Sequence, residues 1–243
     1  MRLLLLSNSQ NPGEEYLSWA QKEVQSFLGY FSVSALFIPY AAITISFDEY
    51  EAKVKARFSE WRHHIKSIHH AWNPVREVEK AEVIVVGGGN TWQLVRLLRE
   101  QGLMELMREK VQSGTPYIGW SAGSNIACPS LCTTNDMPIV DPIGFDTLGL
   151  VPFQINPHYL DKNPEGFGGE TREQRIGEFI KVNPEVYVVG LREATLLRIE
   201  DNSLKLIGSR KARLFKNGEA AKELSSKDDL SFLLDYAPAI PYY

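Results

Sequence analysis

The sequence contains only two cysteines, Cys128 and Cys132, among its 243 residues. Two cysteines cannot form the disulfide framework of a small secreted domain. Their spacing in CPSLC also differs from the CxxC of redox and zinc sites. We therefore expect two unpaired, buried thiols in a protein of the reducing cytoplasm.

Long apolar runs and an excess of positive charge are missing as well. No stretch approaches the roughly 18 apolar residues of a membrane span, and LLLL at residues 3–6 is far shorter than the apolar region of a signal peptide. The formal net charge of -4 argues against a broad attraction to nucleic acid or anionic lipid. We expect neither nucleic acid nor a membrane as a partner, and an acidic ligand would need locally placed cations.

The chain has no internal repeat, no low-complexity tract and no linker rich in proline or glycine. Its 243 residues, of which 44% are hydrophobic and 23% charged, are enough for one α/β domain with a full core. We therefore expect a single domain over residues 1–243. The tail, residues 224–243, mixes charges, apolar residues and prolines, and this pattern predicts no structure for it.

Short apolar runs, typical of strands, alternate with longer patterns whose apolar residues recur every three or four positions, as in helices. The expected strands are residues 3–6, 35–40, 83–86, 117–120, 151–156 and 186–191, and the expected helices are 14–28, 48–61, 91–101 and 171–182. This alternation predicts an α/β fold with a mostly parallel sheet and helices on both faces. After Leu191, turn residues in EDNS and KNGE predict terminal antiparallel hairpin strands.

A glycine-rich loop, VIVVGGGNTWQL, ends one expected strand and begins a helix. In such sheets, ligands bind at the carboxyl ends of the strands. Gly87, Gly88 and Gly89 allow a sharp turn whose amide N–H groups could bind a phosphate or an oxyanion. The loop lacks the spacing of a dinucleotide or P-loop motif. A tight strand-to-helix turn, with Asn90 or Thr91 capping the helix, is the plainer interpretation.

The motif GWSAG, residues 119–123, matches the GxSxG nucleophile elbow and stands between an expected strand and a helix. Gly119 and Gly123 keep the turn free of side-chain clashes. Ser121 would then lie at a helix N-terminus, where the amide of Ala122 can donate to a developing oxyanion. Ser121 could equally be a simple N-cap, a role that serine often fills.

Five histidines could supply the base that a serine nucleophile needs. Four of them stand in EWRHHIKSIHHAW, where we expect a solvated helix face and an adjoining strand without a metal; they are His63, His64, His69 and His70. His158 differs, because it follows the apolar run 151–156. It is therefore expected at the carboxyl end of a strand, on the same edge of the sheet as Ser121.

The base in turn needs an orienting carboxylate, and two residues compete for that role. Glu193 follows the expected strand 186–191 and so reaches the same edge of the sheet. Asp136 lies in the polar loop TTNDMPIVDP and would give the chain order of the α/β-hydrolases. Because the order of triad residues varies among unrelated folds, the residues alone leave both open.

Six motifs together resemble the peptidase E family of serine peptidases, which are α-aspartyl dipeptidases. The motifs are LLLLSNS, VVGGGNT, YIGWSAGSNIACP, TTNDMPIVDP, QINPHY and GETREQRI, and they occur in the family's order and spacing. The likeness runs from the N-terminus to about Leu191 and weakens in the hairpins. It implies a cytoplasmic enzyme with a class I glutamine amidotransferase-like sheet that hydrolyses dipeptides beginning with aspartate.

The resemblance also implies roles for individual residues. Ser121 corresponds to the nucleophile and His158 to the general base, with Gly89 and Ala122 as oxyanion donors. Such a mechanism uses neither a cofactor nor a metal.

The family's carboxylate maps onto either Asp136 or Glu193, and the position at a strand end favours Glu193. Glu193 is followed by Ala194, where the family usually has a glycine.

We expect Arg172, the arginine of ETREQR, to bind the side-chain carboxylate of the substrate's aspartate. A guanidinium can bind a carboxylate with two parallel hydrogen bonds. Arg175 is the next choice, and Asn90 is a further substrate-binding candidate. The competing interpretations are a related hydrolase of other aspartyl peptides or polymers and a non-catalytic amidotransferase-like binding module. We expect a monomer or a homodimer.

Overall fold

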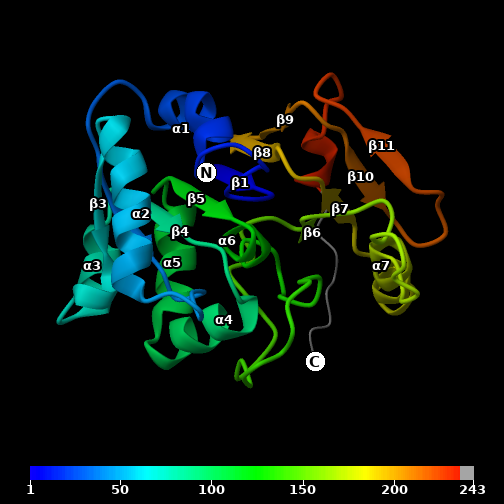
Figure 1. Cartoon of the computed structure of the whole chain (residues 1–243), viewed down its shortest axis with the longest axis horizontal. Coiled ribbons are helices and arrows are strands. Elements are labelled where there is room, and N and C mark those ends of the chain that lie inside the picture. Colours follow the sequence, from blue (N-terminus) through cyan, green and yellow to red (C-terminus); the bar gives the residue numbers. More distant parts are fainter. Residues whose placement is uncertain (236–243) are drawn as a thin grey trace.

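The computed structural model describes residues 1–235, in which eleven strands form two sheets (Figure 1). The larger sheet has the strand order β3-β2-β4-β5-β1-β8-β9. Its strands are β1 (Arg2–Leu6), β2 (Ser34–Ile38), β3 (His64–Ser67), β4 (Val83–Val86), β5 (Tyr117–Trp120), β8 (Thr195–Glu200) and β9 (Ser203–Gly208). Strands β1 to β5 run parallel to one another, whereas β8 is antiparallel to β1 and β9 is antiparallel to β8.

The smaller sheet has the strand order β11-β10-β7-β6 and lies with helix α7 on the right of Figure 1. Its strands are β6 (Gln154–Pro157), β7 (Val188–Leu191), β10 (Ala212–Phe215) and β11 (Lys222–Leu224). Strands β6 and β7 are parallel to each other, so their carboxyl ends lie side by side. This pairing brings the residues after Pro157 and after Leu191 together.

Seven α-helices and three 3-10 turns connect the described strands. The helices are α1 (Gln21–Leu28), α2 (Phe47–Glu60), α3 (Pro74–Lys80), α4 (Thr91–Glu100), α5 (Leu103–Gln112), α6 (Ala122–Asn125) and α7 (Arg172–Val182), and the 3-10 turns are η1 (Ser18–Ala20), η2 (Ile68–His70) and η3 (Ser231–Leu233). Ser46 and Thr171 form capping boxes that start α2 and α7. These caps satisfy amide groups that a helix N-terminus leaves free.

The inner parallel strands of the larger sheet, β1, β2, β4 and β5, are buried on both faces, which explains their continuous apolar sequences. In β1, Leu3 and Leu5 belong to one core cluster, while Leu4 and Leu6 belong to another. Alternate residues of a strand point to opposite faces, so each cluster occupies one face. Helices α1 and α2 contribute to the cluster around Leu4, and α3, α4 and α5 contribute to the one around Leu3.

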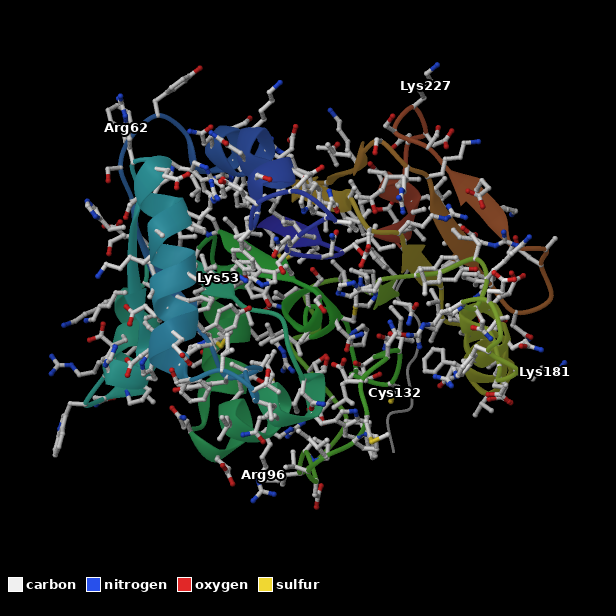
Figure 2. The ribbon with its side chains drawn as sticks, viewed as in Figure 1. Lys53, Arg62, Arg96, Cys132, Lys181 and Lys227 are labelled. Atoms are coloured by element: carbon white, nitrogen blue, oxygen red, sulfur yellow. The ribbon has the colours of Figure 1, made fainter. Side chains whose placement is uncertain are left out.

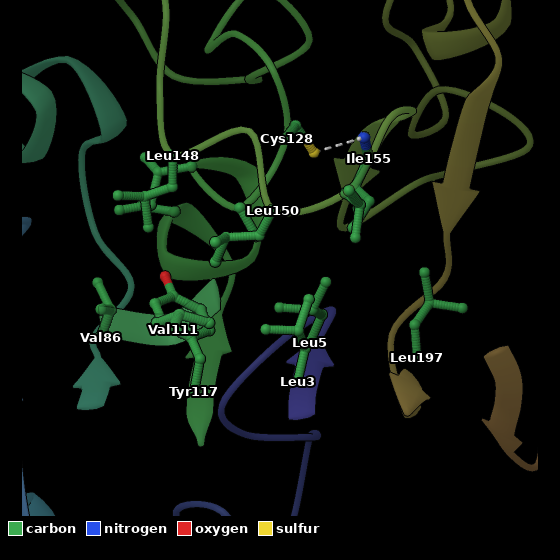
Figure 3. Packing of buried hydrophobic residues seen from close by; sticks show 14 of the residues in the cluster. Leu3, Leu5, Val86, Val111, Tyr117, Cys128, Leu148, Leu150, Ile155 and Leu197 are labelled. Atoms are coloured by element: carbon green, nitrogen blue, oxygen red, sulfur yellow. Dashed lines mark hydrogen bonds between the residues drawn. The ribbon is translucent and has the colours of Figure 1, made fainter. Parts of the chain in front are cut away.

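The core cluster around Leu3 and Leu5 also joins the two sheets. It includes Ile155 of β6, whose backbone N–H donates to Sγ of Cys128 at 3.1 Å (Figure 3). Burial raises the pKa of the Cys128 thiol. The thiol therefore stays protonated and packs as an apolar group.

The predicted α/β fold, with a mostly parallel sheet flanked by helices, is confirmed, and so are the two hairpins, β8–β9 and β10–β11. The division into two sheets was not expected.

The helix predicted over residues 14–28 begins only at Gln21, because Leu17 has a left-handed backbone (φ 57°) and a 3-10 turn follows it. Within the tail, β11 ends at Leu224 and η3 is an ordered turn, and residues 236–243 lie outside the described part of the chain.

The prediction of two buried thiols is half right. Cys128 is buried, but Cys132 is exposed, in the loop that follows α6 (Figure 2). That loop has little regular structure, so the spacing of its residues does not predict which of them face the core. Among residues 1–235, no helix has the length and apolar character needed to cross a membrane.

Candidate active site

Ser121 occupies a strained turn between β5 and α6. Its backbone angles, φ 52° and ψ -112°, lie outside the regions that non-glycine residues favour. A Cβ on Gly119 would overlap the carbonyl of Gly123, and one on Gly123 would overlap the carbonyl of Val86. Both glycines are therefore required for the turn. Ser121 holds the N-cap position of α6, yet its side chain accepts no bond from the helix.

The Ser121 hydroxyl instead faces His158, which directly follows β6. Nε2 of His158 lies 3.0 Å from Oγ of Ser121, and Nδ1 lies 2.8 Å from Oε1 of Glu193. Glu193 follows β7, the parallel neighbour of β6. A proton on Nδ1 can be donated to the carboxylate, which leaves Nε2 free to accept the serine proton. Serine, histidine and glutamate thus form a continuous hydrogen-bonded chain.

Two polar residues at the end of β1 hold this chain in place. Oγ of Ser7 donates to the carbonyl of Leu191 at 2.7 Å and accepts from the amide of His158 at 2.9 Å. Oδ1 of Asn8 accepts from the amide of Ala194 at 2.9 Å. Sequence reasoning assigned neither residue a role. The sequence contains a pattern that could have indicated such a role, because the polar residues SNS directly follow the apolar strand LLLL and so lie at its carboxyl end.

Asp136, the alternative carboxylate, is held elsewhere. Its Oδ2 accepts from the amide of Thr91 at 2.7 Å and from the hydroxyls of Thr91 and Thr134, at the N-terminus of α4. Among the described residues it has no hydrogen bond with His158. Geometry therefore brings Glu193, and not Asp136, against the histidine.

The amide N–H groups of Gly89 and Ala122, near Ser121, have no hydrogen-bond acceptor among residues 1–235. Ala122 is the first residue of α6, where a helix leaves its N–H groups free. Gly89 has φ 139°, and a Cβ there would overlap the carbonyl of Ala41. A Cβ on the preceding Gly88 would come within 2.9 Å of the Cβ of Ser121. The glycine loop thus packs directly against the serine.

The hydroxyl of Tyr50, a buried residue of α2, supports the glycine loop. It donates to the carbonyl of Gly88 at 3.0 Å and accepts from Nε1 of Trp120 at 2.9 Å. Burial raises the pKa of Tyr50, so its hydroxyl keeps its proton. In a trans peptide the C=O and the next N–H point in opposite directions. Fixing the carbonyl of Gly88 therefore fixes the direction of the Gly89 N–H.

A cavity of about 660 Å³ opens beside this machinery. Ser121, His158, Gly89 and Asp136 line it. Asn90 lines it too, but its side chain already caps α4 through the amide of Gln93 and donates to the carbonyl of Met137. The substrate-binding role predicted for Asn90 would have to coexist with these bonds.

Arg172, predicted to bind the substrate's carboxylate, lies next to the cavity rather than in its lining. It lines a small neighbouring pocket together with Asn135 and Arg175. Burial and the nearby charge of Arg175 lower the pKa of the Arg172 guanidinium, and Asp136 acts in the opposite direction. Among the described residues Arg172 has no ion-pair partner, so its charge is available to a ligand.

The arrangement has all the parts of a serine-based acyl-transfer site. A nucleophile contacts a base, a carboxylate orients the base, and two free amides lie near the nucleophile. Sequence reasoning named Ser121 from its motif and His158 and Glu193 from their positions after strands, with Asp136 as the alternative carboxylate. The amide of Ala122 followed from the same motif as Ser121, and Gly89 was taken from the family resemblance.

Comparisons with known proteins agree with this chemistry. The chain matches peptidase family S51 over residues 3–207. It is 50% identical over 236 residues to the peptidase E of Nostoc sp. PCC 7120, which covers 97% of this chain and 98% of that protein. It is 47% identical over 226 residues to the peptidase E of Salmonella typhimurium, covering 93% and 98% respectively. A solved peptidase structure from an acI-B1 Actinobacterium covers 95% of this chain and 96% of its own, with a TM-score of 0.68 and 18% identity, which bears on the fold alone.

Proposed function

Because this chain belongs to peptidase family S51 and is therefore a peptidase, we propose that it is a serine dipeptidase that hydrolyses Asp-X dipeptides through an acyl-enzyme on Ser121. The observation that carries the proposal is the position of His158, whose two ring nitrogens lie 3.0 Å from Ser121 and 2.8 Å from Glu193.

In the acylation step, Oγ of Ser121 attacks the carbonyl carbon of the aspartyl residue while Nε2 of His158 accepts the hydroxyl proton. The oxygen of the tetrahedral intermediate takes the negative charge, and the amides of Gly89 and Ala122 donate to it. His158 then returns its proton to the leaving amine, and the C–N bond breaks. The products of this step are a free amino acid and an aspartyl ester on Ser121.

In the second step, a water molecule attacks the ester and gives one proton to Nε2 of His158. The histidine passes this proton to Oγ of Ser121 as the C–O bond breaks, which releases aspartate and restores the free enzyme. Glu193 accepts a hydrogen bond from Nδ1 throughout and stabilises the imidazolium that forms in both steps.

An Asp-X dipeptide carries two carboxylates, and two cations near the cavity lack an ion pair among the described residues. We assign Arg172 to the aspartate side chain, because a guanidinium can grip a carboxylate with two parallel hydrogen bonds. We assign Lys53 to the C-terminal carboxylate. Lys53 lines the cavity, with its ammonium 4.1 Å from the ring centre of Tyr16, and Figure 2 shows it on the side of α2 toward the middle of the molecule.

The direct test of the mechanism is Ser121→Ala. We expect kcat on Asp-Leu to fall by roughly 10³- to 10⁶-fold, because removing a triad member leaves only oxyanion and binding contributions. The circular dichroism spectrum should remain that of the parent. Ser113→Ala, an exposed serine after α5, is the matched control and should keep full activity. Turnover by Ser121→Ala close to that of the parent would exclude the acyl-enzyme.

A substrate panel separates this function from its alternatives. We expect Asp-X to be cleaved with a far higher kcat/KM than Glu-X, Asn-X or acetylated Asp-X. Comparable hydrolysis of acetylated Asp-X or of aspartyl polymers would indicate the related hydrolase. Binding without hydrolysis would indicate the non-catalytic module. The free thiols of Cys128 and Cys132 support a reducing cytoplasm as the site of action.

A further inference from the structure

Four side chains with metal-binding atoms meet at the β3 edge of the larger sheet, outside the cavity of Ser121. Asp48 and Glu51 come from the first two turns of α2, and His69 and His70 come from η2. One ligand atom from each residue lies within 4.8 Å of the others. The histidine motif predicts no such contact, because the carboxylates stand about twenty residues earlier in the chain.

Helix α2 and the 3-10 turn η2 bring these four side chains together. Asp48 and Glu51 are three residues apart on a helix and so share a face. The rings of His69 and His70 lie side by side, with centres 3.9 Å apart. Nε2 of His69 is 3.0 Å and Nε2 of His70 is 3.3 Å from Oδ1 of Asp48, and Nε2 of His70 is 2.8 Å from Oε2 of Glu51.

These spacings are close to those of a tetrahedral metal site. Ligands about 2.0 to 2.1 Å from a zinc ion stand roughly 3.3 Å from one another. Three of the pairs measured here lie between 2.8 and 3.3 Å. The remaining pairs lie within 4.8 Å, so the ion could be admitted by side-chain rotations without a change in the backbone of α2 or η2.

Ser67, the last residue of β3, orients two of the four ligands. Its hydroxyl lies 2.6 Å from Nδ1 of His69 and donates to the carbonyl of Phe37 at 3.5 Å, so it can accept the Nδ1 proton. Its amide donates to Oε1 of Glu51 at 3.3 Å. Such bonds behind the ligands fix ring orientation and tautomer in metal sites.

Two carboxylates and two imidazoles face one another in this cluster. The rings of His69 and His70, with centres 3.9 Å apart, both present Nε2 to the same carboxylate oxygen, Oδ1 of Asp48. A cation between these groups would take nitrogen ligands from the histidines and oxygen ligands from the carboxylates.

We propose that Asp48, Glu51, His69 and His70 bind one divalent transition-metal ion of the zinc type. Two imidazoles with two carboxylates suit Zn²⁺, Co²⁺ or Ni²⁺, whereas Mg²⁺ and Ca²⁺ prefer oxygen ligands alone. The ion takes no part in the reaction at Ser121.

Its role is structural, and it acts on one wall of the active-site cavity. Phe47, beside Asp48, packs its ring 5.6 Å from that of His69 and 5.7 Å from that of Tyr40. Residues 41–45, between Tyr40 and the start of α2, line the cavity, and the carbonyl of Ala41 accepts from the amide of Asn90. An ion that ties α2 to η2 therefore holds this loop in place.

The test starts from the full chain after treatment with EDTA and removal of the chelator. Zinc chloride should bind with a stoichiometry near one by calorimetry. At a hundredfold excess over the dissociation constant it should raise the unfolding midpoint by about 5 to 10 °C. Cobalt chloride should give the visible absorption of a tetrahedral site with nitrogen and oxygen ligands.

Matched variants locate the ion. His70→Gln and Asp48→Asn should lose the zinc-dependent shift in midpoint and the cobalt spectrum. His64→Gln, an exposed histidine of the adjacent strand β3, should keep both, as should Cys132→Ser. The proposal is overturned if the parent shows no metal-dependent shift, or if His70→Gln and Asp48→Asn both keep it. Because kcat at 25 °C should be the same with and without EDTA, failure here leaves the proposed function untouched.

Discussion

Three residues around the candidate active site have a positive φ although none of them is glycine: Ser121, His158 and Ala194. Such backbone costs of the order of 1 to 3 kcal/mol per residue and persists only where neighbours enforce it. Ser7 accepts from the amide of His158, and Asn8 accepts from that of Ala194. Hydrogen bonds with the two residues that follow β1 therefore stabilise the strained backbone of His158 and Ala194.

Substitution of the two competing carboxylates should separate their roles. Glu193→Gln should lower kcat by roughly 10⁴-fold with little change in stability, because the amide no longer favours the correct histidine tautomer. Asp136→Asn should mainly cost stability, about 0.5 to 2 kcal/mol, because it weakens the bonds that hold the start of α4. Steady-state kinetics and urea unfolding of both variants measure the two effects. The reverse ranking of kcat would transfer the orienting role to Asp136.

The strain at Ala194 predicts a stabilising substitution. Ala194 has φ 62°, which costs an alanine about 1 to 2 kcal/mol, whereas glycine adopts it freely. Ala194→Gly should therefore raise the free energy of unfolding by about 0.5 to 1 kcal/mol, after the greater entropy of glycine in the unfolded chain is subtracted. Ala52→Gly, in the exposed middle of α2, is the control and should lower it by about 1 kcal/mol. Urea unfolding of both variants measures these changes. A lower free energy of unfolding in Ala194→Gly would contradict the claim that Ala194 is strained.

Among the elements, α2 connects two parts of the molecule. Its first two turns carry Asp48 and Glu51 of the proposed metal site, and between them Tyr50, which bonds to the glycine loop. The same turns of one helix therefore support both a surface cluster and the glycine loop beside Ser121.

Tyr50→Phe tests the support of the glycine loop. Without the bond to the carbonyl of Gly88, the Gly88–Gly89 peptide can turn, and the Gly89 N–H loses its alignment with the oxyanion. We expect kcat to fall by about 10-fold while KM changes little. Tyr40→Phe is the control, since it removes an equivalent bond from a buried tyrosine to Gln101, away from the loop. An equal loss of kcat in both variants would mean that the effect is general destabilisation.

On the scale of the whole molecule, a chain of net charge -4 has to bind a doubly acidic substrate. Many basic side chains at the surface are already paired with acids; Arg192, for example, binds both Asp161 and Glu223. Under the proposed function, Lys53 in the cavity lining and Arg172 of the neighbouring pocket are the unpaired cations assigned to the substrate's two carboxylates.

Matched substrates test both cations. Lys53→Met should lower kcat/KM for Asp-Leu by about fivefold, as expected for an exposed ion pair, and should leave that for Asp-Leu amide unchanged. Arg172→Lys should lower kcat/KM for both substrates by about 10- to 200-fold. Arg175→Lys serves as its control. If Arg172→Lys cleaves Asp-Leu as well as the parent does, the cation for the side chain is a different residue.

The parts of the site that were predicted from sequence share one property. Ser121, His158 and Glu193 each follow an apolar strand closely, and the rule that such positions converge at one edge of a sheet needs no knowledge of packing. Arg172, Lys53 and the metal cluster depend instead on how helices far apart in the sequence pack together. Their place in the fold could not be predicted from the spacing of residues.

The fold class was predictable for a similar reason. Apolar periodicity distinguishes strands from helices, and their alternation implies parallel pairing. The division into two sheets was not predictable, because the expected strands 151–156 and 186–191 are short apolar runs between loops and helices, as 83–86 and 117–120 are. Only the partner of each strand differs, and a single sequence does not encode that in its local pattern.

The catalytic chain crosses from one sheet to the other. Ser121 follows β5 of the larger sheet, whereas His158 and Glu193 follow β6 and β7 of the smaller one. The histidine and the glutamate therefore belong to one sheet and the serine to the other, and the 3.0 Å contact between Oγ and Nε2 spans the junction. Ser7, which directly follows β1, bonds to the carbonyl of Leu191 and to the amide of His158, and so connects the end of β1 to the ends of β6 and β7. If Ser121 acts as proposed, the transfer of its proton depends on how closely the two sheets are docked.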